Sequence, residues 1–294
     1  MDFSLDVGRR FFMSVLSYNR EYRSTIFSLL FDDKDALLSL YNALNDSNYD
    51  DADGLTINTL KDGGIFMKFR NDVSFVFCSQ LTIIEHQSTV NPNMPLRNLY
   101  YVTDLYKNMV TTKQLYKESL TYIPAPRFVV LYNGKEDRPL VETLRLSDAF
   151  ERIDLSDNKE HELELVVTVY NINLDKDPKL LQKCKPLLDY ALLIESMNKA
   201  IISAGKKDEE RAQALEKVID ECIAEDLLSD FLTRYKSEVV KMYVWEYDEE
   251  LEKAAHREEL EEKANEIAEL KKQLLQRDNQ INELKKEIED LKKI

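Results

Sequence analysis

Two apolar runs separated by two residues constrain the fold of this sequence more than any other feature. The runs are residues 73–78 and 81–87, and both are rich in β-branched and aromatic side chains. Such runs predict strands, and the short connection predicts an antiparallel hairpin. With a two-residue turn at positions 79–80, we expect Asp72 to face Gln87 across the pair.

The end of this hairpin carries the most suggestive polar side chains of the sequence. In the same pairing Ser74 faces Glu85, and because side chains alternate along a strand, Asp72, Glu85 and Gln87 share one face. Two neighbouring carboxylates raise each other's proton affinity unless a cation lies between them, and Mg²⁺ suits such a pair. Gln87 is then a candidate for orienting the attacking water. The alternative is that these residues are ordinary strand ends, and His86, on the opposite face, is expected to be structural.

The remainder of the body predicts a mixed α/β sheet flanked by helices. Helical periodicity occurs over residues 22–45, with Asp32 or Asp33 as an N-cap in its middle, and over residues 96–109, with Pro95 in the first turn and Asn93 as the cap. Further strands are predicted at residues 65–69 and from Arg127 and Leu163 onward. We therefore expect an α/β domain over residues 1–175 and a helical extension over residues 176–245, with a kink or break near Pro186.

The C-terminal segment, residues 246–294, has a seven-residue apolar repeat. One position of the repeat is occupied by Ile267, Leu274, Ile281 and Ile288, and the other by Leu270, Leu284 and Leu291, with Arg277 as the exception. Isoleucine and leucine in these two positions favour a parallel two-stranded coiled coil. We expect a homodimer through this helix; a single long solvated helix is the alternative.

Charge and composition limit the classes of function. The chain has 294 residues and a net charge of −15, which argues against a tight, non-specific DNA binder unless a local basic patch or metal ions offset the field. The three cysteines are far apart and form no CxxC pair, as expected in a reducing compartment. No Gly-rich phosphate loop, secretory signal or membrane-spanning run is recognisable, so a cytoplasmic location without membrane contact is expected.

Several motifs in order along the chain resemble one family. They are "YRSTIFSLLFDDKDALLSLYNALN", "RNDVSF", "EHQSTVNPNMPLRNLYYVTDLY", "PAPRFVVLYNG", "LRLSDAF", "LELVVTVYNIN" and "DECIAEDLLSDFL". The chain resembles the Rpn family of recombination-promoting nucleases and putative transposases, in the PD-(D/E)xK nuclease superfamily. The resemblance implies a restriction-endonuclease-like fold, with Asp72 and Glu85 as Mg²⁺ ligands and Gln87 as the third active-site residue.

The same resemblance extends to residues around this motif. Arg97 and Tyr101 match the helix after the strand and lie one turn apart, and Glu21 matches an acidic residue on the first helix of some superfamily members. The superfamily lysine is absent, because Gln87 stands in its place. The resulting hypothesis is a Mg²⁺-dependent DNA endonuclease of mobile-element character. The alternative is a catalytically weak or inactive member that acts in assembly through its tail.

Overall fold

The computed structural model describes residues 22–59, 71–151, 162–176, 178–204 and 207–243, together with Lys263, Lys271 and Lys272. The chain forms two compact units, residues 1–242 and residues 243–294. The predicted heptad positions and the predicted strand at residues 65–69 lie outside the described residues. In the part of the chain that the structure describes, no helix has the length and apolarity needed to span a bilayer.

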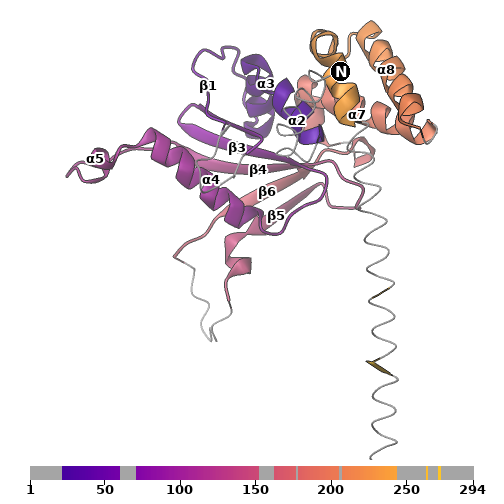
Figure 1. The fold of residues 1–294 in the computed structure, drawn as a ribbon. Helices are drawn as coiled ribbons and strands as arrows, with labels where there is room; N and C mark the ends of the chain where they lie inside the picture. Colours follow the sequence, from indigo (N-terminus) through magenta and orange to yellow (C-terminus); the bar gives the residue numbers. More distant parts are fainter. Residues whose placement is uncertain are drawn as a thin grey trace, which may run out of the picture. The chain divides into compact units, whose positions relative to one another are not determined.

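The first unit contains a six-stranded mixed sheet, which confirms the predicted α/β class (Figure 1). The strands lie in the order β1-β2-β3-β4-β6-β5; β3, β4 and β6 are parallel, and the other neighbouring pairs are antiparallel. Their bounds are β1 Thr56–Ile57, β2 Val73–Phe77, β3 Gln80–Gln87, β4 Ala125–Tyr132, β5 Val141–Arg145 and β6 Val166–Asn171.

Helices cover both faces of this sheet (Figure 1). One face packs against α4, and the other against α2 and α7. Up to residue 243, the helices of the described residues are α2 Tyr22–Leu30, α3 Lys34–Asn45, α4 Met94–Met109, α5 Thr112–Leu115, α6 Lys179–Lys183, α7 Lys185–Ser203, α8 Asp208–Ala224 and a helix over residues 229–243, with short 3₁₀ turns at Leu146–Ala149 and Leu174–Lys176.

Alternation along β3 divides its side chains between these two helical layers. Leu81 and Ile83 belong to the apolar core beneath α4, together with side chains of β4 and β6 such as Val130 and Val167. Because side chains alternate, Glu85 and Gln87 are placed on the α4 side as well. All of β3 from Leu81 onward is buried, since both faces of this central strand are covered.

The predicted hairpin exists, but its register is displaced by one residue on each strand. The turn consists of Cys78 and Ser79 rather than residues 79–80, and Phe77 pairs with Gln80. The φ angles of the two turn residues are 48° and 60°, the positive values that match a two-residue turn to the twist of its strands. Each residue of β2 therefore pairs with a residue two positions earlier in β3 than predicted. Because side chains alternate with a period of two, every side chain still lies on the predicted face of the sheet.

Local helix signals are largely borne out. The carboxylate of Asp33 accepts a hydrogen bond from the N–H of Ala36 at 2.9 Å and caps α3. Pro95 lies in the first turn of α4, although Asn93 makes no side-chain cap there. The helical segment around Pro186 is broken, because α6 ends before Cys184 and α7 begins after it with the proline in its first turn.

Three elements were not predicted from the sequence. The edge strand β5 alternates between exposed and half-buried side chains without an apolar run. Strand β1 is only two residues long. The short helix α5, which follows α4, has no buried side chain. None of these elements has the buried periodicity on which the sequence predictions depended.

Candidate functional site

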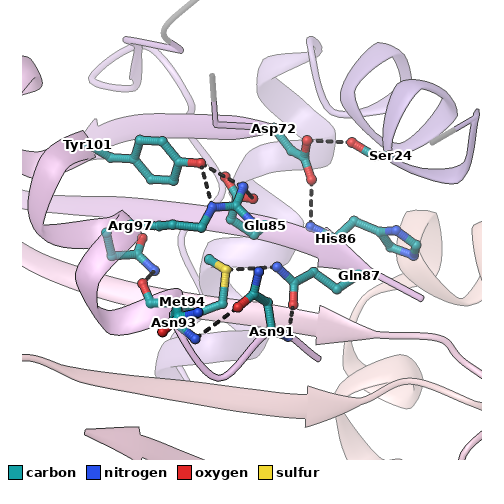
Figure 2. A network of polar contacts seen from close by, with 11 residues as sticks. Ser24, Asp72, Glu85, His86, Gln87, Asn91, Asn93, Met94, Arg97 and Tyr101 are labelled. Atoms are coloured by element: carbon teal, nitrogen blue, oxygen red, sulfur yellow. Dashed lines mark hydrogen bonds and ion pairs between the residues drawn. The ribbon is translucent and has the colours of Figure 1, made fainter. Parts of the chain in front are cut away.

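The candidate site lies where β2 begins and β3 ends. The ladder of these strands closes at Val73 opposite Ile84, and its continuation by one residue sets Asp72 opposite Glu85. One carboxylate oxygen of Asp72 accepts the backbone N–H of His86 at 2.6 Å, and the other accepts the hydroxyl of Ser24 from α2 (Figure 2). The side chain of Asp72 therefore connects the start of β2 and the end of β3 to α2.

Glu85 is bound by the first turns of α4. Its Oε2 lies 3.1 Å from Nη2 of Arg97, and the same nitrogen donates to the hydroxyl of Tyr101 at 2.7 Å. Glu85 and Tyr101 are buried, whereas a third of the Arg97 side chain is exposed. Figure 2 shows the guanidinium lying between the tyrosine hydroxyl and the carboxylate. Arg97 and Tyr101, one turn apart on α4, thus both reach the predicted site.

Gln87 is directed toward the loop that leads into α4. Its Oε1 accepts the N–H of Asn91 at 3.1 Å, and its Nε2 donates to the sulfur of Met94 at 2.7 Å. The side chain is buried. These contacts hold the turn from which α4 starts, so Gln87 fixes where Arg97 stands relative to Glu85 (Figure 2).

His86 lies on the other face of the sheet, as expected for a structural residue. Its ring stacks on Phe27 with the centroids 5.6 Å apart, and its Nε2 lies 3.1 Å from the hydroxyl of Tyr190. Tyr190 donates to the carbonyl of Arg23, so Nε2 of His86 carries the proton in this pairing. Burial, with a smaller contribution from Arg23, lowers the pKa of His86 to about 3, and the imidazole is neutral at physiological pH.

Burial and neighbouring charges shift the pKa values of Asp72 and Arg97. Burial raises the pKa of the Asp72 carboxyl above its usual value, against the opposing effects of Ser24, the His86 N–H and Arg97. Burial alone lowers the pKa of Arg97, but the neighbouring Glu85, Tyr101 and Asp72 outweigh it and raise the value. Arg97 thus binds Glu85 at 3.1 Å and also acts electrostatically on the half-buried Asp72.

A divalent cation is compatible with this donor set. The described residues contain no cluster of three or more histidine, cysteine or acidic side chains suited to a metal ion. Mg²⁺, however, is commonly held by one or two carboxylates, with water and substrate phosphate in the other positions. Asp72 and Glu85 supply two such carboxylates at the paired ends of adjacent strands.

Sequence reasoning placed Arg97 and Tyr101 near Glu85 but missed the partners of Asp72 and Gln87. Ser24 is 48 positions away from Asp72, and Asn91 and Met94 bind Gln87 through a backbone group and a thioether, so no sequence motif indicates these contacts. Glu21 lies outside the described residues. No protein-family model matches the chain, and searches of curated proteins and of solved structures find no significant match.

Proposed function

We propose that this protein is a Mg²⁺-dependent DNA endonuclease of the PD-(D/E)xK type, related to the Rpn nucleases. The observation that carries the proposal is the alignment of Asp72 with Glu85 on adjacent antiparallel strands, with the guanidinium of Arg97 bound to one carboxylate and electrostatically coupled to the other. Placing two carboxylates and one cation close together in buried and half-buried positions is costly for a fold, and such groups concentrate at functional sites.

The order of elements around the carboxylates supports a restriction-endonuclease-like core. Helix α2 precedes the hairpin, α4 follows it, and β4 returns parallel to β3. The carboxylates lie at the start of one strand and near the end of the next. The superfamily signature likewise has an aspartate near the start of one strand and its glutamate on the next, although the lysine of that signature is replaced here by Gln87.

In this proposal, each side chain of the site has a distinct role. Asp72 and Glu85 would hold Mg²⁺, which lowers the pKa of a bound water and neutralises charge on a phosphodiester. Arg97 supplies, from α4, the positive charge that the missing lysine would provide on β3. Tyr101 orients the guanidinium through its hydroxyl, and Gln87 positions the start of α4. Gln87 is thus a positioning residue rather than one that touches substrate.

DNA is the proposed substrate, and a coiled-coil homodimer the proposed assembly. The heptad repeat of residues 246–294 would pair two copies and present two sites to the two strands of a duplex. Association with recombination or mobile elements follows from the family resemblance alone.

One observation favours the alternative, an inactive nuclease fold that acts in assembly through its tail. Both oxygens of Asp72 and one oxygen of Glu85 already accept hydrogen bonds from the protein. A network of this kind also stabilises a fold without any catalysis. The two proposals differ in whether removal of the Asp72 charge abolishes a metal-dependent reaction.

The test is cleavage of supercoiled plasmid by the full chain in Mg²⁺ and in chelator. Asp72→Asn keeps the size of the side chain and can still accept from His86, but it removes the negative charge. We expect nicking by the wild type in Mg²⁺ and a loss of at least a hundredfold in Asp72→Asn, as is typical for removal of a major electrostatic contribution to catalysis.

Asp53→Asn is the matched control, because it makes the same change in an exposed turn. Its cleavage rate should equal that of the wild type. Equal cleavage by Asp72→Asn contradicts the site assignment, and no cleavage by the wild type with any divalent ion supports the assembly alternative.

A further inference from the structure

An arm projects from the α/β unit between α4 and β4 (Figure 1). We define the arm as residues 110–124, which include the short helix α5. Its base is fixed because the hydroxyl of Tyr106 donates to the carbonyl of Pro124 at 2.7 Å. The arm is therefore an ordered extension that starts from the C-terminal end of α4.

Polar contacts around Gln114 give the arm its shape. The Gln114 side-chain oxygen accepts both the N–H and the hydroxyl of Thr111, at 2.8 and 2.7 Å. Its backbone carbonyl accepts the hydroxyl of Thr121 at 3.1 Å. A capping interaction thus stabilises the beginning of the arm, and a second hydrogen bond connects its end to α5.

The apolar side chains of the arm are left in solvent. Their exposed fractions run from 69% to 87%, for Leu115, Tyr116, Leu120 and Tyr122. Single exposed apolar residues are normal, but four within eight positions on a shaped projection mark a contact surface. Two of the four are tyrosines, whose flat rings suit stacking.

The charge of the arm has the opposite sign to that of the whole chain and favours a polyanionic partner. The chain as a whole has 55 acidic and 40 basic residues, yet residues 110–124 contain two lysines and one acidic residue. Lys113 and Lys117 are exposed beside the tyrosines, while Lys107 is paired with Asp104. A basic, aromatic projection on an acidic protein complements a polyanion with exposed rings.

We propose that the arm binds an unpaired DNA strand, with Tyr116 and Tyr122 stacking on bases and Lys113 and Lys117 contacting phosphates. This inference rests on the proposed function, which makes DNA the substrate. Stacking on aromatic side chains requires bases that are not covered by a duplex neighbour, so single strands, frayed ends or flaps are preferred over intact duplex.

The position of the arm relative to the candidate site sets a length requirement. Arg97 lies in the first turns of α4, and the arm follows its last turn. The twelve residues that follow Arg97, up to Met109, span about 18 Å of helix, so the strand must continue for several nucleotides beyond the bond at the site. Very short oligonucleotides cannot reach both.

Binding of a fluorescein-labelled single-stranded oligonucleotide, followed by anisotropy in chelator, tests the arm without cleavage. Tyr116→Ala/Tyr122→Ala should weaken binding by about fivefold or more for each tyrosine. Tyr116→Phe/Tyr122→Phe keeps the rings and should bind as the wild type does. Lys113→Gln/Lys117→Gln should reduce the slope of log affinity against log salt by about 1.4, because two phosphate contacts are lost.

The matched control is Lys34→Gln/Lys179→Gln, which removes two exposed lysines elsewhere and should leave the salt slope unchanged. Equal affinity of the double alanine variant and the wild type overturns the inference, as does tighter binding of a duplex of the same sequence. If sedimentation shows that the alanine variant loses self-association, the arm is an interface between copies and the inference is wrong. Plasmid cleavage by the wild type is a separate readout, so the proposed activity and the arm can fail independently.

Discussion

The backbone N–H of His86 donates to the carboxylate of Asp72 at 2.6 Å, at the point where β2 no longer pairs with β3. The side chain of Asp72 thus replaces the next rung of the ladder, and the same carboxylate binds Ser24 of α2. The carboxylate that is proposed to bind metal therefore also completes the end of the β2–β3 ladder. Stability and plasmid cleavage, measured on the same Asp72→Asn variant, separate these two roles.

Asp72→Asn should increase stability at neutral pH. The ordinary pKa of the carboxyl is 3.8 and burial raises it in the folded protein, so the unfolded chain ionises first as the pH rises. The favourable contribution is complete below pH 3.8 and is lost as the pH passes the folded value. Asparagine can accept from His86 and donate to Ser24 without this penalty. We expect a gain of about 1 kcal/mol at pH 7 in urea unfolding and no difference at pH 3.

Asp53→Asn provides the baseline for this comparison, because its side chain is exposed. A variant at Asp72 that is less stable than the wild type at pH 7 shows that the carboxylate is a net stabilising group.

Arg97→Ala should destabilise the protein more than loss of a surface ion pair. Glu85 is buried, and the substitution leaves its charge without the guanidinium that it now contacts at 3.1 Å. A cost of about 3 kcal/mol is expected for breaking such a pair from one side.

Glu85→Gln/Arg97→Ala should recover much of this loss, because the buried charge is also removed. Urea unfolding of the two single variants and the double variant gives the coupling energy. Additive effects of the two substitutions contradict a direct interaction.

His86→Phe should reduce the loss of unfolding free energy that occurs as the pH falls below 6.5. The pKa of His86 falls from 6.5 to about 3 on folding, so below pH 6.5 the unfolded chain takes up a proton that the folded chain does not. The stability contributed by the neutral imidazole is complete above pH 6.5 and is lost as the pH falls toward 3. Phenylalanine preserves the stacking with Phe27, and Tyr190 keeps its bond to the Arg23 carbonyl.

The difference in unfolding free energy between this variant and the wild type, measured from pH 7 to pH 4, should therefore change in favour of the variant as the pH falls. A constant difference over this range contradicts a buried neutral histidine.

Ser79→Gly should stabilise the hairpin turn. Ser79 has φ of 60°, a left-handed conformation that glycine adopts without the steric cost borne by other residues. Part of this gain is offset by the greater freedom of glycine in the unfolded chain, so about 0.5–1 kcal/mol is expected. Thermal unfolding measures the change.

Gln80→Gly is the control one position later. It lies in β3 and pairs with Phe77, so glycine should destabilise the protein there. If Gln80→Gly is the more stable of the two variants, the turn lies at residues 79–80 instead.

The local features of this protein were determined by the sequence itself. The alternation of side chains along residues 81–87 separates Glu85 and Gln87 from His86 whichever turn register is chosen, because a displacement by two residues preserves faces. The cap at Asp33 and the helix break near Pro186 depend on neighbours within a few positions. Such features follow from backbone geometry and need no distant partner.

Tertiary structure decided which groups those side chains meet. Ser24 reaches Asp72 because α2 packs on β3, and Gln87 turns to Met94 because the following loop folds back beneath α4. Exposure of the arm was equally unpredictable, since "QLYKESLTYI" has the composition of a segment that could be buried. Periodicity along a chain determines the direction of a side chain, but its partner and its contact with solvent depend on where distant elements pack.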